Sequence, residues 1–129
     1  MASLFSKIIE GEIPCYKVAE NDSFLAFLDI MPIKEGHVLV IPKVETDYIF
    51  DIDDNQLGEM MIFAKSVAKK IEKVFTCNRI GVTVIGLEVP HAHIHLIPID
   101  KLDDMNFAKP KLSLNADQLA EIAKKLSEA

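Results

Sequence analysis

Hydrophobic and polar residues recur with two different periods along this chain. The clearest helical pattern covers residues 57–75, where apolar side chains are three or four positions apart and Asp51 to Asp54 supplies N-cap candidates. Another amphipathic run follows Asn115, and a short one covers residues 3–10 before Gly11, which can take the left-handed conformation that ends a helix. The pattern predicts one long helix and short N- and C-terminal helices.

Strand patterns fill most of the remaining sequence. Residues 15–20 and 23–28 flank the turn-forming pair Asn21-Asp22, which predicts a hairpin. The branched apolar run 37–41 is typical of a buried strand. Residues 79–85 lead through a short connection into a last strand-like stretch, so we expect these two to pair antiparallel. This order predicts an α+β domain with an antiparallel sheet of about five strands.

The last strand-like stretch, Pro90–Pro98, carries three of the four histidines. His91, His93 and His95 alternate with apolar residues, the period of a strand that packs one face and would present the imidazoles on the other. His37 stands where the buried run begins. We expect chemistry here, because an imidazole can act as nucleophile, base or metal ligand near neutral pH.

Three interpretations of this cluster are open. The outer pair, His91 and His95, would lie about 13 Å apart on a strand, which disfavours convergence on one metal ion, although two of the triad with His37 could form a metal site. A purely structural role suits a lone histidine better than a cluster. Alternatively, His93 could attack phosphorus with one ring nitrogen while the other donates to a backbone carbonyl, and its neighbours bind phosphate oxygens.

Charge limits the class of partner. The formal net charge is -6 and Arg79 is the only arginine, which argues against non-specific nucleic-acid binding, because that mode needs clustered cations. An anionic substrate would have to be held locally by histidines, backbone N–H groups and a few lysines.

Composition indicates an ordinary globular protein. No apolar run approaches membrane-spanning length, and residues 1–7 lack a basic region followed by an apolar stretch, so we expect a soluble cytoplasmic protein. Cys15 and Cys77 have no CxxC spacing and are expected to be reduced thiols.

Four segments resemble, in order, the landmarks of the histidine triad (HIT) family. Residues 91–97, His-Ala-His-Ile-His-Leu-Ile, are similar to the family signature of three histidines alternating with apolar residues. The other matching segments are residues 3–14, 24–30 and 36–43. The resemblance implies a HIT-like fold for one domain, residues 1–129, with a core over 3–98 and a C-terminal extension with a helix over 99–129.

The activity that the resemblance implies is that of a nucleotide hydrolase or transferase. It would cleave a nucleoside phosphoramidate or related nucleotide at the α-phosphate, through a nucleotidyl intermediate on His93. By similarity, the carbonyl of His91 orients the His93 ring, His95 contacts the α-phosphate and His37 completes the cluster. The implied chemistry needs no metal or other cofactor.

A purine nucleotide is the implied substrate. Asp29 would accept the ribose hydroxyls. The residues expected to wall the purine are Leu4, Phe5, Ile8, Phe27 and Ile30. Family members are commonly homodimers joined through the long helix and a strand, so we expect a homodimer. From its charge and its lack of long apolar runs, we expect the protein to bind neither nucleic acid nor membranes.

The chain departs from the family pattern at three places, one of which is the segment after Pro98, which matches no tail that defines a branch of the family. Some bacterial members bind zinc through two cysteines and a histidine, but Ser3, Ser6 and Glu45 occupy those positions here, so we expect no structural zinc. The loop before the triad is short, and Glu88 stands where similar enzymes place a neutral residue near the scissile bond. Its charge should disfavour polyphosphate leaving groups and favour small or basic ones.

Competing interpretations remain at this level. The shortened loop would also suit a catalytically weak nucleotide sensor or interaction module with the same fold. A dinucleoside polyphosphate hydrolase and a metalloprotein are further alternatives.

Overall fold

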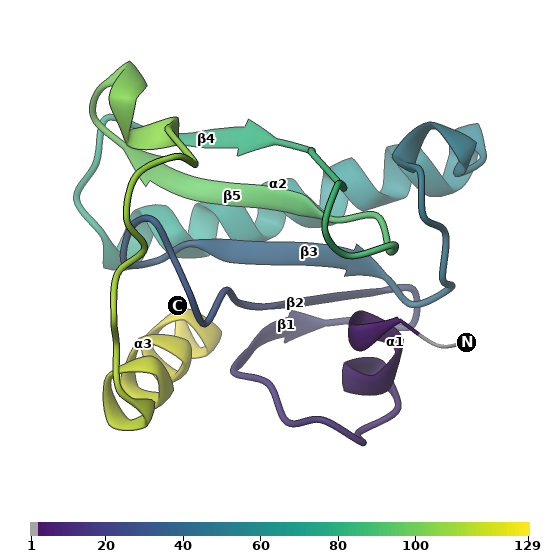
Figure 1. The fold of residues 1–129 in the computed structure, drawn as a ribbon, viewed down its shortest axis with the longest axis horizontal. Helices are drawn as coiled ribbons and strands as arrows, with labels where there is room; N and C mark the ends of the chain where they lie inside the picture. Colours follow the sequence, from purple (N-terminus) through teal and green to yellow (C-terminus); the bar gives the residue numbers. More distant parts are fainter. Residues whose placement is uncertain (1–2) are drawn as a thin grey trace.

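Five strands form one antiparallel sheet, in the order β1-β2-β3-β5-β4, in the computed structural model, which describes residues 3–129 (Figure 1). In chain order they are β1 (Lys17–Glu20), β2 (Phe24–Leu28), β3 (Val38–Pro42), β4 (Arg79–Thr83) and β5 (Ile94–Ile99). The predicted α+β class is confirmed. Met1 and Ala2, the first residues of the expected domain, lie outside the described part of the chain.

Three α-helices accompany the sheet. They are α1 (Leu4–Ile9), α2 (Asp54–Val74) and α3 (Ala116–Glu128), with short 3-10 helices η1 (Ile49–Asp51) and η2 (Leu102–Met105). Asp53 caps α2 by accepting the N–H of Gln56 at 2.8 Å, and Asn115 caps α3 in a reciprocal pair with Gln118. Gly11 follows α1 with a φ of +82°, as its position predicts.

The two faces of the sheet have different covers. On one face, alternate strand residues such as Phe24 and Ala26 pack with α2, which Figure 1 shows behind the sheet, and with α3. On the other face, Leu25 and Phe27 pack with Phe5 of α1. Because both faces are covered, β2 and β3 are buried along their whole length and carry no polar alternation.

The strand that carries the histidines is shorter than predicted. It begins at Ile94 rather than at Pro90, because the backbone before it bonds outside the sheet: the N–H of Ala92 donates to the carbonyl of Thr46 at 2.7 Å. Only His95 of the triad therefore lies on β5. The predicted antiparallel pairing of β4 with β5 is confirmed. However, β4 ends at residue 83 instead of 85, because β5 provides no pairing partner beyond that point.

Two other sequence-based expectations concern the whole chain. Cys15 and Cys77 are both free and partly buried, as expected. Among residues 3–129, no helix has the length and apolar character needed to cross a membrane.

Candidate active site

The four histidines meet on the face of the sheet that α1 covers. His95 lies on β5, His91 and His93 lie in the loop before it, and His37 directly precedes β3. The centroid of the His95 ring is 4.9 Å from that of His93 and 5.2 Å from that of His37. The fold thus brings together all four histidines that the sequence singled out.

The histidine face is closed, so the expectation of an open face was wrong. All four side chains are between 0% and 7% exposed. The ring of Phe5 packs edge-on against His93 at 5.1 Å, and the ring of Phe107 packs against His95 at 5.0 Å, between centroids. Period-two alternation predicts which residues share a face, but it carries no information about what covers them.

Sequence reasoning missed Phe107 and its neighbour Lys111. The apolar residues of 99–112 follow neither a helical nor a strand period. The structure places only the short helix η2 in this segment. No local signal in the sequence places this segment beside the histidines.

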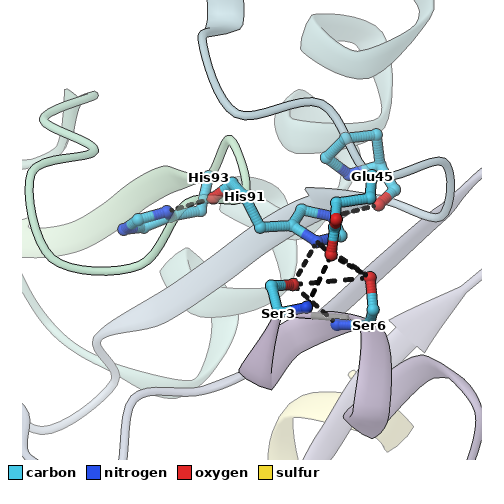
Figure 2. Close-up of polar contacts among 6 residues, drawn as sticks. Ser3, Ser6, Glu45, His91 and His93 are labelled. Carbon is cyan, nitrogen blue, oxygen red and sulfur yellow. Dashed lines mark hydrogen bonds and ion pairs between the residues drawn. The ribbon is translucent and has the colours of Figure 1, made fainter. Parts of the chain in front are cut away.

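The tautomer of His93 is set by the backbone. Its Nδ1 lies 2.8 Å from the carbonyl oxygen of His91 (Figure 2), and a carbonyl can only accept, so Nδ1 carries the proton. In a neutral imidazole the other nitrogen, Nε2, then has a free lone pair. This arrangement suits a nucleophile that must stay deprotonated on one side and anchored on the other.

A second backbone group sets the tautomers of His37 and His95. The N–H of Ile33 donates to Nδ1 of His37 at 3.3 Å, so the proton of a neutral His37 resides on Nε2. That Nε2–H faces Nδ1 of His95 at 2.9 Å and donates to it. His95 is left with its own proton on Nε2, as a hydrogen-bond donor.

Burial keeps these imidazoles neutral. Desolvation, followed by the nearby His95, lowers the pKa of His37 to about 3. Desolvation, followed by the nearby His93, lowers the pKa of His95 to about 4. The pKa of His91 is also lowered, again mainly by burial. At neutral pH these three side chains therefore carry no charge, and the tautomers derived above for His37 and His95 hold.

A polar network joins the loop that carries His91 to the start of α1 (Figure 2). Nε2–H of His91 donates to the carbonyl of Pro42 at 2.8 Å, so its Nδ1 accepts from the hydroxyl of Ser3 at 2.9 Å. The Glu45 carboxylate accepts the N–H of Ser3 and the hydroxyl of Ser6, both at 2.7 Å. These bonds, the Ser6 bond first, lower the pKa of Glu45 to about 2. The network fixes both His91 and the helix that carries Phe5.

This network does not suit zinc. Structural zinc sites use thiolates and imidazoles with a free nitrogen. Here the serine hydroxyls donate to acceptors inside the network, and both nitrogens of His91 already have partners. Each donor of the network therefore has an acceptor within it, and the network holds together without a central ion.

A second cluster has the spacing of a metal site. One ligand atom each from Asp29, His37 and His95 lies within 4.8 Å of the others. However, the Ile33 N–H places the proton of His37 on the nitrogen that faces this cluster, 2.9 Å from His95 and 3.6 Å from the Asp29 carboxylate. The cluster therefore contains one hydrogen bond, from His37 to His95, and the carboxyl of Asp29, whose pKa is raised mainly by burial, lies beside it outside hydrogen-bond distance.

The candidate nucleotide-binding residues divide into buried and exposed groups. Phe5 and Phe27 pack edge-to-face at 5.5 Å, with Ile8 partly buried against the same cluster. Leu4 and Ile30 are 49% and 61% exposed. Glu88 is also exposed, in the loop after β4, and its charge acts on the carboxyl of Asp29. The buried rings of Phe5 and Phe27 therefore lie beside the histidines, while Leu4, Ile30 and Glu88 lie at the surface.

Comparisons with known proteins agree on one relationship. The model of the HIT domain matches residues 10–102 of this chain. The chain is 38% identical to adenosine 5′-monophosphoramidase HNT1 of Saccharomyces cerevisiae over 128 residues, 97% of this chain and 80% of that protein. A Hit-like protein of Bartonella henselae is similar in structure with a TM-score of 0.85 and 32% identity, over 98% of this chain and 94% of that one. A zinc-bound histidine triad family protein of Mycobacterium smegmatis has a TM-score of 0.83 and 25% identity, over 99% and 92% of the two chains.

Proposed function

The chain belongs to the histidine triad family, and from this premise we propose that it cleaves nucleoside phosphoramidates or related nucleotides at the α-phosphate, through a nucleotidyl intermediate on His93. The observation that carries the proposal is the bare Nε2 of His93, opposite an Nδ1 anchored at 2.8 Å on the carbonyl of His91. The similarity to a yeast adenosine 5′-monophosphoramidase supports the substrate class.

The reaction would proceed in two displacements at phosphorus. Nε2 of His93 attacks the α-phosphorus, and the bond from phosphorus to the amine breaks on the opposite side; the amine nitrogen takes up a proton from solvent and leaves as the neutral amine. The positive charge that develops on the His93 ring is stabilised by its Nδ1–H bond to the His91 carbonyl. A water molecule then attacks the same phosphorus and loses a proton to solvent, while the phosphorus–nitrogen bond to Nε2 breaks and its electrons return to the ring. Throughout, Nε2–H of His95, oriented by His37, donates to a phosphate oxygen.

Substrate binding would use the groups around this centre. Asp29 accepts the ribose hydroxyls, and the cluster of Phe5, Phe27 and Ile8 supports the purine, with Leu4 and Ile30 at its edge. A turnover screen of adenosine and guanosine phosphoramidates and dinucleoside polyphosphates tests the proposal directly. Binding of AMP without turnover of any of these compounds would refute it in favour of a nucleotide sensor.

Glu88 is expected to set the preference for the leaving group. Replacing it by glutamine removes an exposed negative charge, so kcat/KM for a dinucleoside polyphosphate should rise by about 3- to 10-fold relative to that for a phosphoramidate with a neutral amine. The same assay on Glu128→Gln, a change at the end of α3, serves as the matched control. An equal change for both substrates would show that the charge of Glu88 does not discriminate leaving groups.

We further propose a homodimer formed through β4 and α2. β4 is an edge strand, and apolar side chains are exposed on both elements: Val82 is 51% exposed, Met61 50% and Ile62 64%. Light scattering should give twice the 14.4 kDa chain mass for the wild type and a single chain mass for Ile62→Asp. Leu102→Asp, at an exposed apolar residue of η2, should remain dimeric. A monomeric wild type contradicts the proposal.

A further inference from the structure

The segment between β5 and α3, residues 100–112, is fixed against the loop that precedes β3. The carboxylate of Asp104 accepts the N–H of Asp100 at 2.8 Å and lies 3.6 Å from the ammonium of Lys34. Further along, the N–H of Leu112 donates to the carbonyl of Pro32 at 2.8 Å. Figure 1 shows the segment running from η2 past the ends of the strands to α3. Its two attachments hold the intervening residues beside the histidines.

Phe107 is the part of this segment that contacts the histidines. Its ring centroid is 5.0 Å from that of His95 and 6.2 Å from that of His37, both edge-on. The side chain is only partly exposed. Phe107 thereby covers the hydrogen-bonded pair of His37 and His95.

Lys111 is held by Phe107. Its Nζ donates to the Phe107 carbonyl at 3.0 Å and lies 5.1 Å from the centroid of the Phe107 ring, a cation–π arrangement. In the described part of the chain its contacts are thus a carbonyl and a ring, whereas the nearby Lys109 pairs with the carboxylate of Asp103. The positive charge of Lys111 adds to the lowering of the pKa of His95 and partly offsets the rise that burial causes in the pKa of Asp29. An exposed ammonium with no carboxylate partner therefore stands beside the site.

Among residues 3–129, Lys111 is the one lysine or arginine whose charge acts on His37, His95 or Asp29. Three of the site's histidines are neutral at pH 7, and the ionisable side chains beside them, Asp29 and Glu88, are acidic. The whole chain has a net charge of -6 and one arginine, at residue 79. A negatively charged phosphate brought to the histidines would be stabilised by a nearby cation.

We propose that Lys111, held by Phe107 beside the His37–His95 pair, is the cation that binds the substrate phosphate, which makes the 100–112 segment a determinant of specificity for phosphorylated nucleosides. This inference rests on the proposed function, because it assigns the phosphate-binding charge of the same site. It concerns binding, however, and can be measured without turnover.

The test compares AMP with adenosine, which differ only in the phosphate. Dissociation constants are measured by calorimetry for the wild type, Lys111→Ala, Lys111→Arg and Lys124→Ala, an exposed lysine on α3. Lys111→Ala should weaken AMP binding by about 3- to 10-fold and leave adenosine binding unchanged, as expected for one partly exposed charge pair. Lys111→Arg should retain most of the affinity, and Lys124→Ala should match the wild type.

The outcomes separate this inference from the proposed function. An equal loss for AMP and adenosine would assign Lys111 a structural role and overturn the inference, as would unchanged AMP binding in Lys111→Ala. If the wild type binds AMP but turns over no phosphoramidate, the proposed function fails while the comparison still decides the role of Lys111. If the wild type does not bind AMP, both fail.

Discussion

His93→Ala is expected to lower kcat by on the order of 10⁴-fold or more, because removing a nucleophile eliminates the covalent route and leaves only substrate binding to accelerate the reaction. The fold should be unaffected, since the only polar contact of the His93 side chain in the described structure is with the carbonyl of His91. AMP should therefore still bind with an affinity close to that of the wild type.

The decisive measurement is a quench of the reaction with substrate labelled at the α-phosphorus. Wild-type protein should retain label through a phosphorus–nitrogen bond that survives base and breaks in acid, and His93→Ala should retain none. Lys124→Ala, quenched in the same way, should retain as much label as the wild type, which controls for an effect of substitution in general. Undiminished turnover of His93→Ala, or label retained by that variant, would refute the role of His93 as nucleophile.

Acidification is expected to destabilise the protein from about pH 6.5 downward, through His37 and His95. Burial holds the pKa of His37 at about 3 and that of His95 at about 4 in the folded state, below the value near 6.5 of an unfolded chain. As the pH falls through 6.5, these histidines bind protons in the unfolded chain but stay neutral in the folded chain, so folding becomes less favourable. The loss continues until the folded side chains protonate, near pH 4 for His95 and near pH 3 for His37.

The size of this effect makes it measurable by urea unfolding. We expect the free energy of unfolding to fall by on the order of 6 kcal/mol between pH 7 and pH 4 from these two side chains together. His95→Gln, which keeps a donor and an acceptor but cannot gain a proton, should show a shallower pH dependence than the wild type. Lys124→Ala should run parallel to the wild type, and if His95→Gln also runs parallel, burial of neutral His95 is not the cause.

The elements of the fold could be predicted because their signals are local. The spacing of apolar residues in α2, the apolar run of β3 and the N-caps Asp53 and Asn115 each lie within a few residues of the structure they determine. The start of β5 could not be predicted in the same way. It depends on the carbonyl of Thr46, which accepts the N–H of Ala92 from far along the chain.

The site was predictable to a similar extent. Alternation identified the triad, the position of His37 at the start of the buried run made it a fourth candidate, and the resemblance to HIT proteins added Asp29. The cover of the site was not predictable, because Phe107 reaches His95 through two distant attachments, those of Asp104 and Leu112. Such tertiary contacts leave no period in the sequence around them.

The tautomers of the four histidines have a consequence for how this enzyme could diversify. The groups that assign the protons include the carbonyls of His91 and Pro42 and the N–H of Ile33, all of them main-chain atoms. A substitution at position 33 or 42 that preserves the local backbone path changes a side chain but keeps the peptide group. Mutation can therefore vary the side chains around the histidines, and with them the substrates that are accepted. The positions of the ring protons stay the same, because main-chain groups determine them.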